Sequence, residues 1–167
     1  MQEPATPDHE EERLRALREL LILDTPPEER FDRIVAFAAQ EFDMPMAFVT
    51  LVDAERQWFK ARIGSDAVET ARNVSFCAHA ILQEAPLVVQ DALEDERFHD
   101  NPLVTGEPGI RFYAGAPLAL PGGQSVGTLC IIDRQPRTLD RVELAILQSL
   151  RDLAVEELTR QNDEATP

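Results

Sequence analysis

The sequence predicts an α+β fold, built on a central antiparallel sheet of five or six strands with terminal helices on one face. Three observations lead to this class. Two β-rich apolar runs, Arg111–Leu120 and Val126–Ile132, flank a glycine-containing break, which is the pattern of a β-hairpin. Neither run alternates between apolar and polar residues, so both faces of the sheet are expected to be covered. The strand-like runs follow one another through short turns, which favours antiparallel pairing over βαβ units.

Two amphipathic helices are expected before the first strand, after a disordered segment over residues 1–6. Thr6-Pro7-Asp8 supplies a capping hydroxyl, a proline at the first helical position and an acid in the first turn. The second helix is predicted to begin with a capping box between Thr25 and Glu28. Apolar residues recur at helical spacing in both, at Leu14, Leu17, Leu20 and Leu21 in the first and at Phe31, Ile34, Val35, Ala38 and Phe42 in the second.

Two strands are expected after these helices. Met46–Asp53 is apolar almost throughout and predicts a strand like those of the hairpin. Gln57–Ile63 alternates instead, with Trp58, Lys60 and Arg62 on one face, which predicts a half-buried strand near the edge of the sheet. Its cations are then expected to reach solvent or an anionic group.

A short helix and a further strand come next. Ser75 is the predicted N-cap of a helix over Phe76–Glu84, and Pro86 ends it. Leu87–Val89 then adds a short strand. Within the hairpin, Pro117 has no N–H to donate, so a bulge or an unpaired position is expected there.

Residues 90–109 form a polar connection rich in turn-forming residues. A loop of about 20 residues is long for a compact domain, and such loops are usually functional or disordered. Phe98, Leu103 and Val104 are apolar enough to hold it on a surface. We therefore expect an ordered lid.

A long final helix is expected from an N-cap at Thr138 to about Arg160, followed by a flexible tail over 161–167. It carries two adjacent apolar stripes, which consist of Ile146, Leu150 and Leu153 and of Leu144, Leu147, Ala154 and Leu158. This apolar face is wider than one contact needs. We therefore expect a homodimer held by the terminal helices, with residues 7–160 folded as a single domain.

Composition limits the possible functions. Sixteen basic and thirty-one acidic residues among 167 give a formal net charge of −15. Phosphate backbones and anionic lipid surfaces repel such a chain, so neither nucleic acid nor a membrane is expected as a partner. Two cysteines are too few for a disulfide framework, and the first residues do not have the layout of a signal peptide. A cytoplasmic protein is expected, and the sequence assigns no cofactor.

The chain resembles the GAF domain, a small-molecule sensor module of bacterial signalling proteins, from about Glu12 to Arg160. It is most similar to the GAF domains that stand before histidine kinases or diguanylate cyclases. The stretches that carry the resemblance are Leu20–Phe31, Leu51–Lys60, Ser75–Ile81, Leu87–Phe98, Asn101–Gly106 and Ile110–Asp133. The resemblance implies a GAF- or PAS-like architecture, with a ligand pocket under short helices and loops on the face opposite the terminal helices.

The sequence also departs from several branches of that family. The Asn-Lys-Phe-Asp pattern of cyclic-nucleotide-binding GAF domains is missing. Bilin-binding members place a histidine directly after the attachment cysteine, whereas Ala78 separates Cys77 from His79 here. Free methionine sulfoxide reductases of this fold carry their cysteines in a different local context. The resemblance therefore names no ligand.

Cys77 is the candidate for thiol chemistry. It lies at the predicted start of a helix, where a thiolate is stabilised, so it is either a reactive or attachment thiol or a small buried hydrophobe. Cys130 lies in an apolar strand and is expected in the core. His79 is two residues from Cys77, about 200° around a helix, so the two do not form a metal pair. His79 is expected either to contact a ligand or to hydrogen-bond within the protein.

Six further residues complete the predicted ligand site. Phe76 and Phe98 belong to the cover of the implied pocket. Trp58 supplies a flat contact and Lys60 an anion anchor, unless their strand face is simply solvated. Arg111 is expected to pair with an acid of the lid, and Tyr113 to offer a hydroxyl to the pocket or the core. The acids within reach of Arg111 are Asp91, Asp95 and Asp100.

The expected function is a free-standing sensory or regulatory domain without catalytic activity. It binds an unidentified small molecule and signals through its terminal helices to a partner such as a histidine kinase or a diguanylate cyclase. Two alternatives stay open. One is a thiol-dependent reductase of the free methionine sulfoxide reductase kind that uses Cys77, and the other is a ligand-free dimerisation scaffold.

Overall fold

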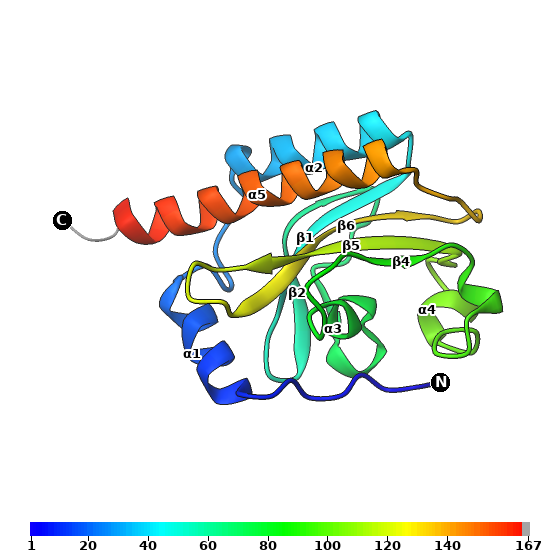
Figure 1. The fold of residues 1–167 in the computed structure, drawn as a ribbon, viewed down its shortest axis with the longest axis horizontal. Coiled ribbons are helices and arrows are strands. Elements are labelled where there is room, and N and C mark those ends of the chain that lie inside the picture. Colours follow the sequence, from blue (N-terminus) through cyan, green and yellow to red (C-terminus); the bar gives the residue numbers. More distant parts are fainter. Residues whose placement is uncertain (165–167) are drawn as a thin grey trace.

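The computed structural model describes residues 1–164, with side chains through Arg160, and its centre is a six-stranded sheet (Figure 1). The strand order is β3-β2-β1-β6-β5-β4, and every neighbouring pair is antiparallel. This confirms the predicted α+β class. The strands are β1 Met46–Val52, β2 Arg56–Ile63, β3 Glu69–Ala71, β4 Leu87–Val89, β5 Phe112–Ala119 and β6 Ser125–Asp133.

Helices cover both faces of this sheet. Figure 1 shows α2 and α5 side by side along one face, with α3 and α4 against the other. The helices are α1 Glu10–Glu19, α2 Glu29–Phe42, α3 Phe76–Ala80, α4 Pro102–Thr105 and α5 Arg141–Glu164, with single 3₁₀ turns η1 Arg72–Val74 and η2 Ala92–Glu94. The predicted tail over 161–167 begins inside α5, and its last three residues lie outside the described part of the chain.

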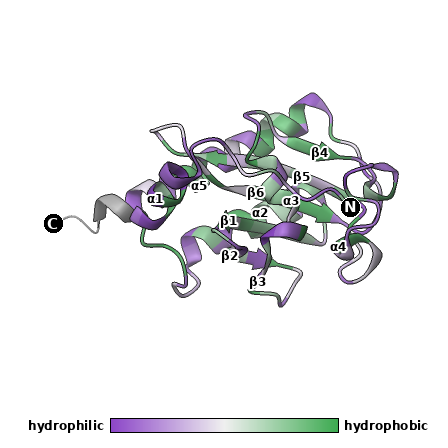
Figure 2. Ribbon diagram, turned by 90° about the horizontal axis from the view of Figure 1, so that it is seen from below, coloured by the Kyte–Doolittle hydropathy of each residue, from purple (hydrophilic) through white to green (hydrophobic). Residues whose placement is uncertain are grey.

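Alternate residues of the central strands β1, β5 and β6 enter two separate apolar cores. Along β1, Ala47, Val49 and Leu51 pack under α2 and α5, whereas Met46 and Phe48 face α3. We call these two sides of the sheet the helix face and the cavity face. Figure 2, which looks toward the cavity face, shows apolar residues along much of the central strands. The apolar hairpin strands are therefore covered on both faces, as their composition predicts.

The hairpin is formed as expected, with β5 paired to β6 from Phe112 to Ala119. The register shifts between Pro117 and Ala119, which confirms the predicted irregularity at the proline. A second bulge, which the sequence does not predict, lies in β2, where the register shifts opposite Val49 and Thr50.

Three predicted helix starts differ from the structure. The first helix begins at Glu10 instead of Pro7, because Asp8 and His9 form a turn with His9 in the left-handed region at φ 61°. The capping box of α2 is wrong, since Thr25 donates its hydroxyl to the Ile22 carbonyl and accepts from Lys60 instead. The predicted N-cap Thr138 is also wrong. Asp140 and Glu143 cap α5 reciprocally, each accepting a hydrogen bond from the other's backbone N–H.

The N-terminal segment over residues 1–6 lies along the outside of the cavity face. The Gln2 N–H donates to the Arg97 carbonyl at 3.2 Å, and the Gln2 carbonyl lies 3.1 Å from His79 Nε2. The Met1 amino group pairs with Asp100. The sequence predicts disorder for this segment, whereas these contacts join it to α3 and the lid.

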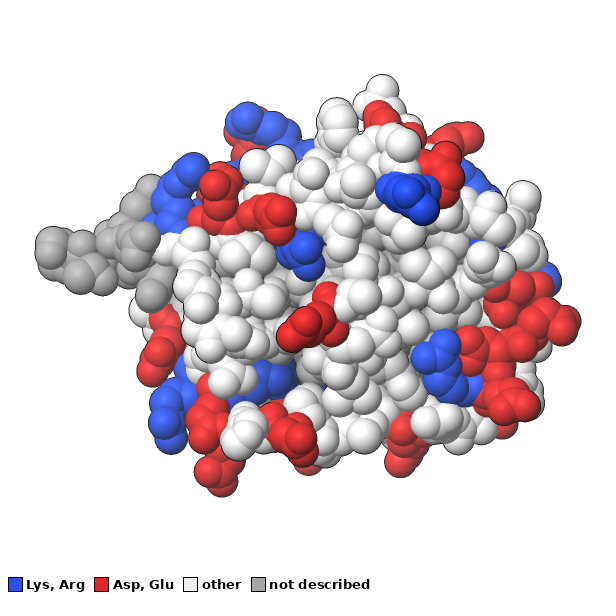
Figure 3. Space-filling view, viewed as in Figure 1, with Lys and Arg blue, Asp and Glu red and all other residues white. Residues whose placement is uncertain are grey.

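Charged side chains are unevenly distributed on the face of the molecule that Figure 3 shows. Acidic side chains gather near the position of α4, and a broad uncharged area lies between them and a few charged side chains near the centre of the view. The described helices include none that is long and apolar enough to cross a membrane.

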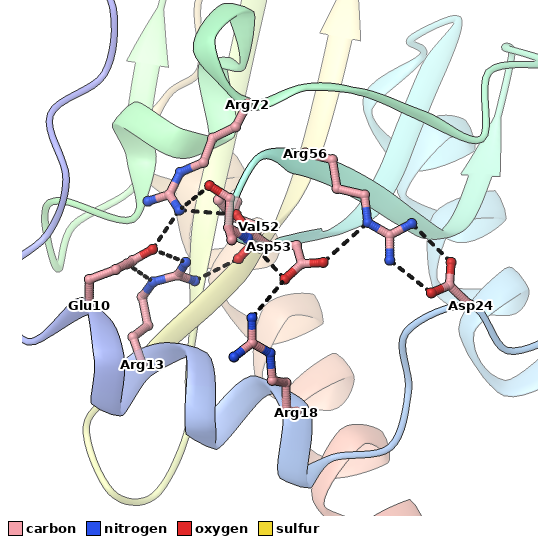
Figure 4. A network of polar contacts seen from close by, with 9 residues as sticks. Glu10, Arg13, Arg18, Asp24, Val52, Asp53, Arg56 and Arg72 are labelled. Atoms are coloured by element: carbon pink, nitrogen blue, oxygen red, sulfur yellow. Dashed lines mark hydrogen bonds and ion pairs between the residues drawn. The ribbon is translucent and has the colours of Figure 1, made fainter.

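A network of polar contacts fixes α1 to the end of the sheet (Figure 4). Arg13 is buried, pairs with Glu10 at 2.6 Å and donates to the Val52 carbonyl at 2.8 Å. Arg72 contacts the same Glu10 carboxylate and donates to the Asp53 carbonyl at 3.0 Å. Burial opposes ionisation of Glu10, but the two guanidinium groups outweigh it and hold the pKa of Glu10 below its usual value. Since Arg72 belongs to η1, the network joins α1, the β1–β2 turn and the segment that leads into α3.

Candidate functional site

The candidate site is a cavity of about 70 Å³ between the cavity face and its cover. The sheet supplies its floor, and α3, the connection after β2, and the lid supply its walls. Ser65 and Ala67 lie at its outer edge, whereas Cys77 and Cys130 are only 3% and 1% exposed. Among the described residues that line it, none is Asp, Glu, Lys, Arg or His. The interior is therefore mostly apolar with a few neutral polar groups.

The polar groups of the floor converge on Cys77. Tyr113 donates its hydroxyl to Cys77 Sγ at 3.2 Å, and Thr128 donates at 3.0 Å. Thr50 lies opposite Thr128 in the β1–β6 register, and their hydroxyl oxygens are 2.7 Å apart. Cys130 Sγ lies 3.9 Å from Cys77 Sγ. We call these five residues the thiol–hydroxyl cluster.

The pKa values of the two cysteines of the cluster are shifted in opposite directions. Burial opposes ionisation of both thiols. For Cys77, hydrogen bonds from Cys130 and from the Thr128 and Tyr113 hydroxyls outweigh burial and lower its pKa. Burial and the neighbouring Cys77 raise the pKa of Cys130 well above its usual value. Cys77 therefore has the lower pKa of the two thiols.

Local sequence explains how this cluster forms. Ser75 caps α3 as predicted, because its Oγ accepts from the Ala78 N–H at 3.0 Å. The same hydroxyl donates to Gln57 at 2.6 Å, which ties α3 to β2. The helix ends at Ala80 rather than Glu84. On β5, a Cβ at Gly115 would lie 2.1 Å from the Tyr113 hydroxyl oxygen, so glycine leaves the room that this ring needs.

An aromatic row links the cluster to the lid. The Phe76 ring lies 5.2 Å from that of Tyr113 and stacks on Phe98 at 4.0 Å. Phe98 is fully buried, so this lid residue is anchored as predicted, and Val104 is buried beside it. His79 meets the edge of Phe98 at 4.9 Å and does not line the cavity. Burial lowers the pKa of His79.

Arg111 holds the first residues of the lid in place through an ion pair with Asp91. Its Nε and Nη2 each donate to the Asp91 carboxylate at 2.8 Å, so the predicted pairing with a lid acid is confirmed for Asp91. The guanidinium holds the pKa of Asp91 below its usual value. Arg111 lies outside the cavity and positions the lid.

Two predicted site residues lie on the other side of the sheet. Trp58 packs in the core of the helix face. Lys60 is only 2% exposed, pairs with Glu28 at 2.6 Å and donates to the Pro26 carbonyl. The bulge in β2 breaks the alternation that the sequence suggests, since it places Ala61 in the core of the helix face. Trp58 and Lys60 are thus separated from the cavity by the sheet.

The predictions place Phe76, Cys77 and Tyr113 in the cavity wall, and the structure brings these three together. They miss Thr50, Thr128 and Cys130 as partners of Cys77. The sequence contains a signal for Thr50 and Thr128, because a threonine within an otherwise apolar strand is a polar group that needs a buried partner. Only the register of β1 against β6 shows which partners meet. No set of three or more His, Cys, Asp or Glu side chains among the described residues is arranged to hold a metal ion.

Comparison with known proteins gives one relative that shares most of this chain. The cyclic di-GMP phosphodiesterase PA2567 of Pseudomonas aeruginosa is 44% identical over 156 residues. The alignment covers 93% of this chain and 27% of that protein, so the chain spans about a quarter of the relative's length.

Solved structures share the fold at low sequence identity. The GAF domain of an Acinetobacter phosphoenolpyruvate-protein phosphotransferase superposes with a TM-score of 0.66 at 16% identity, over 93% of this chain and 98% of that one. Type II free methionine-R-sulfoxide reductase from Thermoplasma acidophilum gives a TM-score of 0.63 at 14% identity, over 77% and 89%. At these identities the likeness shows the fold alone. The GAF domain family itself matches residues 26–158, which is most of the sequence. The chain therefore belongs to the GAF domain family.

Proposed function

We propose that this GAF domain is a cytoplasmic sensory module that binds a small uncharged molecule in the cavity. The observation that carries this proposal is the cavity itself, an apolar space with neutral hydrogen-bonding groups on its floor. Ligand sites of proteins have this composition, with a few placed polar groups in an apolar pocket.

The lining selects against charged ligands. An anion in this cavity would lose its hydration and meet no cationic side chain from the described lining residues. A neutral molecule would exchange water for apolar walls and bond to Gln57, Thr70 or the floor hydroxyls. A cyclic dinucleotide has two phosphates, so the name of the Pseudomonas relative supports a regulatory role for this domain rather than hydrolysis in this cavity.

The cavity also limits ligand size. A cavity of roughly 150 Å³ holds benzene, and this one has about half that space. A larger molecule has to displace part of the cover, and the cover consists of short elements such as α3 and α4. Ligand binding is thereby coupled to the position of the cover.

The network of Figure 4 provides a route from the cover to the helices. Arg72 stands directly before the segment that forms α3, and it shares the Glu10 carboxylate with Arg13 of α1. A shift of α3 would change these contacts and the position of α1 at the end of the sheet. We propose that the output is a partner protein or region such as a histidine kinase, a diguanylate cyclase or a cyclic di-GMP phosphodiesterase.

We further propose that the domain forms a homodimer through α2 and α5. Phe37 and Leu153 are 52% and 48% exposed along the groove between these helices. Arg33 and Arg160 flank this apolar centre, and Glu157 pairs with Arg30 and Arg160 of the same chain. The first helix is not part of this surface, and Leu17 is fully buried in the core.

Methyl NMR of the methionines tests ligand binding. Met46 lines the cavity, whereas Met44 packs in the core of the helix face and serves as an internal control. Millimolar benzyl alcohol should shift the Met46 methyl signal and leave Met44 in place, and benzoate should shift neither. Ala67→Trp at the outer edge of the cavity should abolish the shift, whereas Ala85→Trp at another exposed position should preserve it. A Met46 signal that ignores a wide panel of neutral probes would favour the scaffold alternative.

Sedimentation tests the dimer. Leu153→Glu should weaken self-association by about tenfold or more, since apolar groups at the centre of an interface dominate its affinity. Leu82→Glu, at a 42% exposed position outside the groove, should leave association unchanged. A wild-type chain that stays monomeric at high micromolar concentration contradicts the proposal.

A second candidate function is a thiol-dependent reductase. The lowered pKa of Cys77 and its hydroxyl neighbours favour it. The wild-type chain should then consume free methionine sulfoxide in the presence of dithiothreitol, and Cys77→Ser should abolish turnover. No turnover by the wild type would remove this candidate and leave ligand binding unaffected.

A further inference from the structure

The two cysteines occupy positions that neither a structural core nor a simple ligand pocket requires. Cys77 comes from α3 in the cover, and Cys130 comes from β6 at the centre of the sheet. Their sulfur atoms are in contact at 3.9 Å, although 52 residues separate them in the sequence. Both side chains line the cavity, which reaches the surface beside Ala67.

The surroundings of Cys77 favour its ionised form. Two hydroxyl groups, those of Thr128 and Tyr113, donate to its sulfur at 3.0 and 3.2 Å. A buried thiol in an apolar core needs no such donors, whereas a buried thiolate requires them to replace water. The second sulfur, Cys130, has hydrogen bonds from Thr128 and the Phe48 backbone, but burial and the neighbouring Cys77 outweigh them and raise its pKa, which favours the thiol form. This asymmetry provides one attacking thiolate and one resolving thiol.

We propose that Cys77 and Cys130 are a peroxide-reactive dithiol that closes to a disulfide inside the cavity. The Cys77 thiolate attacks one oxygen of hydrogen peroxide or an organic hydroperoxide, which forms an S–O bond and breaks the O–O bond. The leaving hydroxide or alkoxide takes up a proton, and Cys77 becomes a sulfenic acid. The Cys130 thiol then attacks the Cys77 sulfur, an S–S bond forms, and the former peroxide oxygen leaves as water. The dithiol has lost two electrons, and the O–O bond has received them.

The geometry allows this closure. The sulfur atoms have to approach from 3.9 Å to about 2 Å. The cavity beside them provides room for side-chain rotation and for a molecule the size of peroxide, since a water needs only about 10–15 Å³. Closure would tie α3 to β6 and remove the acceptor that Tyr113 and Thr128 now use. Oxidation would thus reset the floor of the ligand cavity, but the reaction itself does not require a ligand.

The experiment is a thiol count by intact mass, and it is unambiguous because the chain has two cysteines. The full chain is reduced, freed of reductant, treated with hydrogen peroxide at pH 7, denatured and alkylated with N-ethylmaleimide. The proposal expects a single chain that has lost two hydrogen atoms and takes up no maleimide, and dithiothreitol should restore uptake of two. Two maleimides after a treatment that oxidises the methionines, or a disulfide only between chains, overturns it.

Three variants assign the roles. Cys130→Ser should accumulate a Cys77 sulfenic acid that dimedone traps, and in Cys77→Ser the remaining thiol should stay reduced. Thr128→Val removes one donor to Cys77 and should slow oxidation at pH 7 by about tenfold for each unit that the pKa rises above the assay pH. Thr159→Val, which removes a hydroxyl on α5 on the opposite side of the sheet, should react at the wild-type rate. Equal rates for the two valine variants, or dimedone labelling of Cys130 in place of Cys77, overturns the proposal.

Discussion

The helix face and the cavity face of the sheet use the same strands but are packed in different ways. On the helix face, α2 and α5 have 14 and 24 residues and lie along the sheet as continuous covers. On the cavity face, α3 and α4 have 5 and 4 residues, and a space remains between them and the strands. Continuous helices bury their neighbours cooperatively, whereas short elements open separately. One sheet thereby supports a stable core on one side and a deformable site on the other.

The buried polar groups of the helix face also differ from those of the cavity face. On the helix face, the buried Lys60 is neutralised by Glu28, a charge pair that fixes the start of α2. On the cavity face, the thiol–hydroxyl cluster uses smaller groups that can change partners. The difference indicates that charges hold the framework and that neutral groups serve the site.

The largest difference between the packing of the two faces is expected from alanine substitutions at two neighbouring residues of β6. Ile131 is fully buried on the helix face, and Ile132 lines the cavity. Ile131→Ala should lower the free energy of unfolding by about 4 kcal/mol, because the helices cannot collapse into the space, whereas Ile132→Ala should cost about 2 kcal/mol. Urea unfolding measures both. Equal losses would mean that the two faces are packed alike.

Hydrogen exchange compares the two covers directly. Amides of the lid, such as those of Val104 and Gly106, should exchange about a hundredfold faster than those of Val126–Ile132, through openings below the global unfolding free energy. Amides in the middle of α2 provide the reference for the helix face. Lid protection equal to that of β6 would show that the cover does not open separately.

Lys60→Met tests the charge pair. The substitution leaves Arg30 as the remaining partner of Glu28. The free energy of unfolding should therefore fall by about 1–2 kcal/mol, which is less than the roughly 3–5 kcal/mol lost when a fully buried ion pair is broken. Burial alone would raise the pKa of Glu28, but hydrogen bonds from Lys60 and Arg30 lower it. A carboxyl with a lowered folded-state pKa stabilises the fold above its unfolded pKa and loses this contribution as the pH falls. Stability of the wild type should therefore decline below about pH 4.5, and less steeply in the variant. Parallel pH profiles would contradict this role.

The smallest effect is expected at the start of the lid. Arg111→Lys replaces two guanidinium hydrogen bonds to Asp91 with the contact of a single ammonium group. The midpoint of urea unfolding should change little. Exchange of the neighbouring lid amides should become faster, and the helix face should not respond. A lowered midpoint with unchanged lid exchange would mean that Arg111 supports the whole fold.

Local patterns explain which features the sequence reveals. The hairpin, the Ser75 cap and the buried Phe98 each depend on residues that are close in the chain or on a single apolar side chain, so they are predictable. The bulge at Lys60 depends on the register of β2 against β1, and it moves Ala61 to the face that Trp58 and Lys60 occupy. The cap of α5 shifts to Asp140 because a reciprocal pair with Glu143 is better placed than Thr138.

The site is harder to predict for the same reason. Cys77 and Tyr113 are recognisable as candidates, but their meeting with Thr50, Thr128 and Cys130 is a product of two strand registers and the docking of α3. Contacts of the N-terminal residues with His79 and Arg97 also join distant parts of the chain. The sequence therefore shows which side chains of the site could be chemically active, but it does not show which residues lie next to them.

The order of the elements has a consequence for how such domains diversify. The helix face is closed by α2 and α5, which lie before the first strand and after the last, whereas the cavity is closed by two internal connections, over 64–86 and 90–111. Lengthening such a connection costs little, about 0.6 kcal/mol for each doubling of a flexible loop. Insertions and deletions there change the volume and chemistry of the cavity while strand order stays the same. Descendants of this fold can thus change the lining of the cavity through heritable changes in loop length, without rebuilding the sheet and its two long helices.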